Sequence, residues 1–302
     1  MLLREDIRRI HAQGRQDPVW FVEKVLGDDV IDYQKAILRA VANNRKVSVR
    51  SCHGIGKSKT AGGMVAPWFL CCHYQSEVIT TAPSLRQVQG IVWKEINRAY
   101  NESEMPLGGR CMKTRWDMGP SWFATGFTTS SNAPDKFQGW HPASGHGIVI
   151  VDEAAGVDQR LYDEGISSIV SSGDSKILLI GNPTNPVGDF RDSHKKGSGY
   201  LRIKVDAFQT PNFTTFGITQ RDIENGEWEG KIAGRSLPRP YLVTPDWVAD
   251  RYKRWGKDSA LYRARVLAEF PLEGADNLIP IYLLDRARDA HLPADDVPRW
   301  GF

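Results

Sequence analysis

One segment, Arg50-Ser-Cys-His-Gly-Ile-Gly-Lys-Ser-Lys-Thr60, most constrains what this chain can fold into. It follows a short β-branched run, Lys46–Arg50, that favours a strand, and it places two glycines directly before Lys57 and Ser58. A strand, a tight glycine loop and a helix that opens at Lys-Ser form the geometry in which backbone N–H groups surround phosphates. The sequence therefore predicts a phosphate-binding loop.

The loop departs from the common G-x-x-x-x-G-K-[ST] pattern at one position, because its first glycine is replaced by Ser51. Gly54, inside the loop, supplies some of the lost backbone freedom. In this arrangement Lys57 would reach the β- and γ-phosphates of a nucleotide, and the Ser58 hydroxyl would bind Mg²⁺. The predicted nucleotide-binding residues of the loop are Ser51, Gly54, Ile55, Gly56, Lys57, Ser58 and Lys59.

Two adjacent carboxylates, Asp152 and Glu153, follow the nearly continuous apolar run Gly147–Val151. Such a run is typical of a strand covered by helices on both faces, and ligands of open α/β sheets bind at the carboxyl ends of such strands. Successive residues leave a strand in different directions. We therefore expect Asp152 to bind the metal and Glu153 to position the attacking water for phosphoryl transfer.

Four further polar residues are candidates for the same site. Asn182 follows the apolar run Lys176–Ile180 and would hold the water or sense the γ-phosphate, although a plain Gly-Asn-Pro turn explains it equally simply. Tyr33 and Gln34 lie upstream of the loop, where they would stack on adenine and recognise its edge. Arg50 would stabilise the transferring phosphoryl group; the alternative is a surface arginine that closes a strand.

Strand and helix signals alternate over the first two thirds of the chain. Glu77–Thr81 and Trp122–Thr128 favour further strands, whereas Tyr33–Ala42, Lys57–Cys72 and the segment that starts at Ser84 favour helices. This order predicts an α/β fold with a mostly parallel sheet flanked by helices. It also suits ATPases in which one strand is inserted between the loop strand and the carboxylate strand, and the D-x-x-G and N-K-x-D motifs of GTPases do not occur.

The composition excludes several classes of protein. With 302 residues, 41% apolar and 25% charged, the chain is not collagen, coiled coil or wholly disordered. No apolar stretch approaches the length of a membrane helix, so we expect no membrane partner. Four cysteines without a C-x-x-C pair favour reduced thiols, and a net charge of +3 requires any polyanion to be held by local patches.

The texture of the sequence changes after Thr210, where Asn-Gly, Gly and Pro turn signals gather. We expect residues 1–210 to form the ATPase core and 211–275 to form a smaller, helical lid subdomain. Residues 276–302, with a helical run at Ile281–Ala290, are interpreted as a linker toward a C-terminal domain that this chain does not carry.

These elements, in this order, resemble the ATPase domain of bacteriophage terminase large subunits, the motors that pump double-stranded DNA into procapsids. The likeness extends to Thr81–Gln89, to Asp135–His141 and to the Gly181–Thr184 segment. It implies a RecA-like fold of the ASCE P-loop type and the cofactors ATP and Mg²⁺. It also implies Gln34 for adenine and Asn182 for coupling hydrolysis to movement.

The resemblance implies partners as well. It predicts sequence-independent binding of double-stranded DNA, with a portal protein and a small terminase subunit as further partners. It also predicts a pentameric ring in the cytoplasm of an infected bacterial cell, with the isolated domain monomeric and slow. Nuclease activity is not expected of these residues. A neighbouring subunit would supply an arginine, for which the candidates are Arg86, Arg98, Arg110, Arg115 and Arg160. The candidate DNA patches are Arg110, Lys113 and Arg115, then Lys195 and Lys196, then Arg235 and Arg239.

Two alternatives remain open on the residues alone. A helicase-like P-loop ATPase would use Gln34, the loop and the Asp152-Glu153 pair equally well. A nucleotide-binding scaffold without turnover would keep Lys57 but would not need Glu153. The rate of ATP hydrolysis by a Glu153 variant separates the scaffold from the enzymes.

Overall fold

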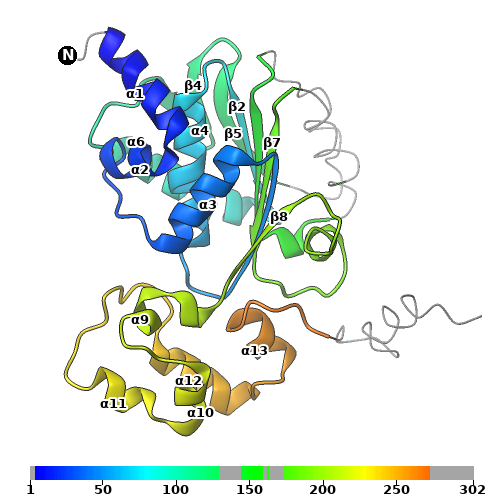
Figure 1. Cartoon of the computed structure of the whole chain (residues 1–302). Helices are drawn as coiled ribbons and strands as arrows, with labels where there is room; N and C mark the ends of the chain where they lie inside the picture. The colour runs from blue at the N-terminus through cyan, green and yellow to red at the C-terminus, as the bar shows by residue number, and fades with distance from the viewer. Residues whose placement is uncertain (1–3, 129–143, 159–161, 163–172, 273–302) are drawn as a thin grey trace, which may run out of the picture.

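The computed structural model describes residues 4–128, 144–158, 162 and 173–272. A sheet with helices on both faces forms the larger part, and a group of helices lies below it in Figure 1. The predicted segments Asp135–His141, Arg160, Ile281–Ala290 and the linker 276–302 lie outside the described residues. No described helix combines the length and apolar character that crossing a bilayer requires.

The sheet has a mostly parallel arrangement. Its strands, in spatial order, are β3 (Arg110–Cys111), β4 (Arg115–Gly119), β5 (Trp122–Thr128), β2 (Glu77–Ala82), β6 (Gly147–Asp152), β7 (Lys176–Gly181), β1 (Lys46–Ser51) and β8 (Leu201–Val205). The pairings from β5 to β8 are parallel, and β3 and β4 are added antiparallel at one edge. Every residue of β2, β6 and β7 is buried, as expected for strands covered on both faces.

The predicted α/β fold class is thus confirmed, and β7 is the strand inserted between the loop strand β1 and the carboxylate strand β6. The predicted strands correspond to β1, β2, β5, β6 and β7, each within one residue at its ends. The short strands β3, β4 and β8 were not predicted. They lie at the two edges of the sheet and are two to five residues long, with several residues exposed.

Helices cover both faces. The first face, here called the α3 face, carries α3 (Asp32–Asn43), a helix that opens at Lys57 and runs through the π-helical turn η1 (Lys59–Val65) into α4 (Ala66–Cys72), and α6 (Trp93–Glu102). The predicted helix from Ser84 comprises α5 (Leu85–Gln87), η2 (Val88–Val92) and α6, and the Ser84 hydroxyl caps it. The helices α1 (Arg4–Gln16) and α2 (Pro18–Lys24) pack at the outer end.

The opposite face, here called the α8 face, packs around different residues of the same strands. Val149 and Val151 of β6 belong to one apolar cluster with Phe270 and with Phe190 of α8 (Asp189–Asp192), whereas Ile148 and Ile150 belong to the α3 face. This alternation is the two-residue period of a strand. It decides which side chains reach each face.

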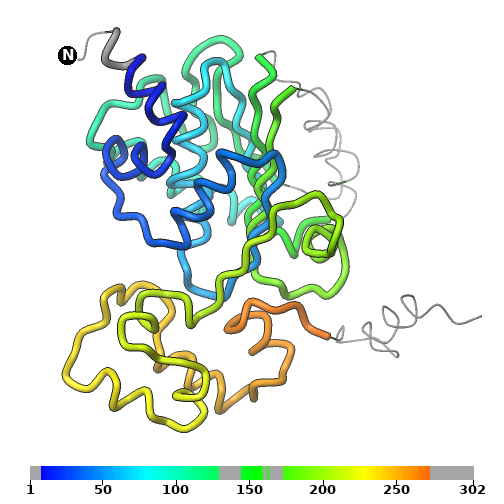
Figure 2. The backbone as a smooth tube through the Cα atoms, in the orientation of Figure 1, coloured from blue at the N-terminus to red at the C-terminus, as the bar shows by residue number. Residues whose placement is uncertain are grey.

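The helical region, residues 207–270, contains α9 (Pro211–Thr214), α10 (Gln220–Asn225), α11 (Trp228–Ile232), α12 (Pro245–Trp255) and α13 (Ala260–Arg265). Thr219, Thr244 and Ser259 cap α10, α12 and α13 with their hydroxyl groups. The chain enters this region from β8 and returns beside the same strand, as Figure 2 shows. Its apolar cluster includes Phe213, Val248 and Tyr262.

Candidate functional site

The glycine loop joins β1 to the helix that opens at Lys57. Gly54 and Gly56 have φ values of +71° and +74°, a left-handed conformation that favours glycine. A Cβ atom at Gly54 would lie 3.2 Å from the Val243 backbone nitrogen, whose N–H donates to the Gly54 carbonyl. The Tyr33 hydroxyl donates to the Ile55 carbonyl at 2.9 Å. The loop is therefore held from both sides.

Lys57 occupies the centre of the site and is 7% exposed. Its ammonium group donates to Asn182 Oδ1 at 2.9 Å and lies 3.6 Å from Glu153 Oε1. The amide nitrogen of Asn182 donates to the Ser51 carbonyl at 2.7 Å. Asn182, the residue directly after β7, thus bonds to the last residue of β1 and orients Lys57.

Asp152 and Ser58 meet beside this lysine. Ser58 Oγ donates to Asp152 Oδ2 at 2.6 Å, and the carboxylate is 1% exposed. Burial, and secondarily the charge of Glu153, raises the pKa of Asp152 to about 6, against the opposing effects of Ser58 and Lys57. Two converging oxygen ligands, one of them a desolvated carboxylate, fit a Mg²⁺ ion, which would relieve the cost of burying that charge.

Glu153 has a left-handed backbone conformation, with φ 50° and ψ 46°, which is strained for a residue with a side chain. Its N–H donates to Asp152 Oδ1 at 3.1 Å. The turn fits because Gly181 lacks a side chain: a Cβ atom there would lie 2.9 Å from the Ala154 nitrogen. The Glu153 carboxylate consequently lies toward Lys57 and remains 36% exposed, where water can reach it.

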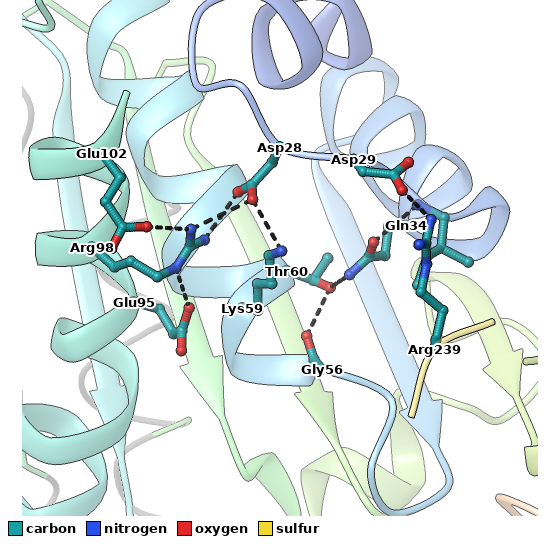
Figure 3. A network of polar contacts seen from close by, with 11 residues as sticks. Asp28, Asp29, Gln34, Gly56, Lys59, Thr60, Glu95, Arg98, Glu102 and Arg239 are labelled. Carbon is teal, nitrogen blue, oxygen red and sulfur yellow. Dashed lines mark hydrogen bonds and ion pairs between the residues drawn. The ribbon is translucent and has the colours of Figure 1, made fainter. Parts of the chain in front are cut away.

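Gln34 and Lys59 support the loop from its outer side (Figure 3). The Gln34 amide accepts from the Ile31 N–H at 3.1 Å and donates to Thr60 Oγ1 at 3.0 Å, and Thr60 donates in turn to the Gly56 carbonyl. Lys59, predicted to bind the nucleotide, pairs with Asp28 at 3.0 Å. Both polar atoms of the Gln34 amide thus bond to groups of the chain itself. Adenine recognition by Tyr33 and Gln34 stays a prediction.

The structure does not bring Arg50 to this group. The strand alternation places Arg50 on the α8 face with Ser48, and its guanidinium lies 5.7 Å from the centre of the Phe270 ring. The helix that opens at Lys57 covers the other face. We therefore leave Arg50 out of the nucleotide site, which corrects its assignment to the transferring phosphoryl group.

Two candidates for the arginine supplied to a neighbour are occupied within the chain. Arg98 forms ion pairs with Asp28, Glu95 and Glu102. Arg115 pairs with Asp117 at 2.7 Å. Arg86 and Arg110 are exposed and stay candidates, whereas Arg160 lies outside the described residues.

His53 was missed by the sequence reasoning, although it lies inside the loop. Its ring stacks on Trp247 of α12 with the ring centres 5.9 Å apart and the planes at 23°. Partial burial, followed by the charges of Lys57 and Arg265, lowers the pKa of His53. The partner Trp247 is far away in the sequence, so no local signal indicated this contact.

The chain is similar to a protein of a bacteriophage. No protein family model matches the chain. A protein of Enterobacteria phage P7 named "Probable terminase, large subunit" is 26% identical over 273 residues, which cover 87% of this chain and 50% of that protein. The chain resembles phage terminase large subunits. It spans about half the length of this curated terminase relative.

Solved terminase structures share the fold. The ATPase domain of the Thermus phage P74-26 large terminase superimposes with a TM-score of 0.53 at 16% identity, covering 83% of this chain and 98% of that domain. A point mutant of the same terminase domain gives a TM-score of 0.52 at 19% identity and the same coverage. The RecA-like fold predicted from the terminase resemblance is confirmed.

Proposed function

We propose that this chain is the ATP-hydrolysing motor domain of a viral terminase large subunit that drives double-stranded DNA into procapsids. One observation carries the proposal: Lys57, Ser58, Asp152, Glu153 and Asn182 converge at the carboxyl ends of β1, β6 and β7. The similarity to the phage P7 terminase and to the P74-26 ATPase domain supports it.

The chemistry follows from the groups at the site. Lys57 and the N–H groups of the loop bind the β- and γ-phosphates, because they supply positive charge at the start of a helix. Mg²⁺, held by Ser58 and Asp152, would neutralise charge on the phosphate oxygens. Glu153 accepts the proton of the attacking water, since its carboxylate is accessible to solvent and positioned by its turn.

Asn182 is the residue through which hydrolysis acts on the fold. Its amide holds both Lys57 and the Ser51 carbonyl, so a change in the contacts of Lys57 on loss of the γ-phosphate alters the link between β7 and β1. In this proposal residues 1–210 are the core and 211–275 move as a lid.

The proposal also includes the oligomeric state and the partners of the motor. The motor works as a homo-oligomeric ring in the cytoplasm of the infected host, with a portal protein and a small terminase subunit as partners. An arginine of one subunit, for which Arg86 and Arg110 are the exposed described candidates, would complete the site of the next. DNA is bound without regard to its sequence, because a motor has to accept every base pair.

The test is steady-state ATP hydrolysis with Mg²⁺ by the wild type and the Glu153→Gln variant, at protein concentrations high enough to favour assembly. We expect the variant to lose at least about 100-fold in kcat, as for the loss of a general base, and to retain ATP binding. Glu229→Gln, an exposed glutamate of α11, is the matched control. Equal rates for Glu153→Gln and wild type refute the catalytic role, and ATP binding without turnover by the wild type favours the scaffold.

A further inference from the structure

Three arginines from three different elements gather beside β8, the edge strand of the sheet. The guanidinium groups of Arg50 on β1 and Arg191 on α8 lie 5.7 Å and 5.0 Å from the centre of the same ring, that of Phe270. Arg202 on β8 donates to the His194 carbonyl at 3.2 Å. We call Arg50, Arg191 and Arg202 the edge arginines.

The edge arginines lack the acidic partners that balance other cations of this protein. Within the part of the chain that the structure describes, none of the three forms an ion pair with a carboxylate, in contrast to Arg98 with its three. Glu269, whose charge acts on Arg50, is already paired with Lys204 at 3.1 Å and with Arg263 at 2.9 Å. Uncompensated like charges at one place oppose folding, and an anionic ligand relieves them.

The imidazole of His194 lies close to the edge arginines, and their positive charges affect its pKa. Its Nε2 lies 2.9 Å from Ser48 Oγ on β1, and its ring lies 5.5 Å from that of Phe270. Burial, together with the charges of the three edge arginines, lowers the pKa of His194 to about 3. The histidine is therefore neutral at pH 7, and the positive potential comes from guanidinium groups, whose charge does not depend on physiological pH.

The residues around the edge arginines favour a phosphate-bearing ligand over a protein partner. A stable protein partner needs an apolar centre to its interface, whereas here Phe270 is buried and the surroundings are basic and polar, with Arg202, Lys195 and Lys196 exposed. Guanidinium groups bind phosphate oxygens with paired hydrogen bonds. Arg50 directly precedes Ser51, so one strand carries both an edge arginine and the start of the nucleotide loop.

We propose that Arg50, Arg191 and Arg202 form a face that grips the phosphate backbone of double-stranded DNA. The proposal rests on the motor function above and adds the place of contact. It joins the predicted patch at Lys195 and Lys196, which lies on the loop between α8 and β8. Contacts to phosphates carry no sequence information, so the grip is the same on every duplex.

All three predicted patches are partly occupied within the chain, and in the patch that the edge arginines join, Lys195 pairs with Asp192 at 2.9 Å. Arg115 pairs with Asp117, and Arg239 of the helical region pairs with Asp29 before α3, as Figure 3 shows. Arg235 lies over the ring of Phe216. These contacts favour the edge arginines as the primary phosphate contacts.

The experiment measures affinity for two unrelated duplexes of equal length as a function of salt. For Arg191→Gln combined with Arg202→Gln, we expect the slope of log K against log salt to fall by about 1 per arginine, equally on both duplexes. Arg191→Lys with Arg202→Lys keeps the charge and should keep most of the slope. Lys94→Gln, an exposed lysine of α6, is the control and should change it little.

An unchanged slope in the double glutamine variant overturns the proposal, as does a wild type that binds neither duplex. Loss of the slope in the lysine variants as well would indicate that packing on Phe270, and not charge, is responsible, which also overturns it. Basal ATPase of the same proteins is measured in parallel and is expected to be unchanged. Absent ATPase in a wild type that binds DNA through these arginines contradicts the motor function and leaves the DNA contact standing.

Discussion

The position of the proposed catalytic carboxylate depends on the absence of a single carbon atom. Glu153 keeps a strained backbone conformation because the end of β7 approaches the following turn closely, and Gly181 leaves room for that approach. The strain is localised where the chemistry requires the carboxylate to leave the strand direction. Gly181 is therefore a positioning residue for Glu153, although it touches no ligand.

Replacing Gly181 by alanine tests this dependence. The new Cβ would lie 2.9 Å from the Ala154 nitrogen, so the turn has to shift. We expect a loss of about 1–3 kcal/mol in the free energy of unfolding and a fall in kcat of at least about 10-fold, measured by urea unfolding and ATP hydrolysis. In the control Gly230→Ala, nothing lies within 4 Å of the added carbon, and we expect unchanged activity. Full activity in Gly181→Ala would contradict the positioning role.

Residues of the candidate site were predictable where a reactive side chain directly follows a glycine loop or a buried strand in the sequence. Lys57 and Ser58 follow a glycine loop, and Asp152 follows a buried strand, so the fold brings them together as expected. Arg50 was misplaced because adjacency in sequence to the loop does not determine the face of the strand. The contacts of Gln34 depend on Thr60 and on the cap of α3, which no local pattern reveals.

At the scale of elements, the helix that opens at Lys57 is fixed by a charged network on its outer side (Figure 3). Asp28, in the segment before α3, pairs with Lys59 of this helix and with Arg98 of α6, each at 3.0 Å. Arg98 also contacts Glu95 and Glu102 of its own helix. Three elements are thereby connected next to the phosphate loop.

Arg98→Ala removes the centre of this network. Asp28 is 11% exposed and would keep only Lys59 as its cation, so we expect a loss of about 1–2 kcal/mol in the free energy of unfolding. Lys94→Ala, on the exposed side of the same helix, should change stability by less than about 0.5 kcal/mol. Denaturant unfolding measures both. A stable but inactive Arg98→Ala protein would contradict the structural role and favour Arg98 as the arginine supplied to a neighbour.

The three fully buried strands were all predicted from the sequence. The strands β2, β6 and β7 are buried throughout, so their apolar runs stand out in the sequence. The strand β8 has Leu201 and Arg202 exposed; its alternation of apolar and charged residues is typical of a half-buried strand, but it is only five residues long and was not predicted. Burial of an edge strand is set by what packs on it, and that depends on the whole fold.

At the scale of the molecule, the phosphate loop belongs to two packing units at once. Cys52 and Ile55 are buried in the apolar cluster of the helical region, together with Phe213 and Tyr262. Backbone hydrogen bonds from Cys52 to Val205 and from His53 to Arg265 close the same junction. A change in the loop is therefore transmitted to the helical region without an intervening linker.

Trp247 offers a probe of this transmission, because its ring stacks on His53 inside the loop. We expect binding of a non-hydrolysable ATP analogue to change tryptophan emission, and the Trp247→Phe variant to lose most of that change while its affinity falls less than about 10-fold, since a phenyl ring retains stacking. Trp122→Phe, at the amino end of β5, should leave the signal intact. An undiminished signal in Trp247→Phe would show that the loop does not act on α12.

The burial of Cys52 and Ile55 also sets a limit on how this protein can be divided or recombined. A truncation after Val205 would remove most of the apolar cluster that buries both side chains, and with it Arg265, whose carbonyl accepts from the His53 N–H. The shortened protein should therefore bind nucleotide poorly even with every phosphate-contacting residue intact. By the same reasoning, if the loop were grafted with its strand and helix into another sheet, Cys52 and Ile55 would be exposed to solvent, because the helical region that buries them would be missing. The unit that can be inherited or transplanted is the loop together with the helices beneath it.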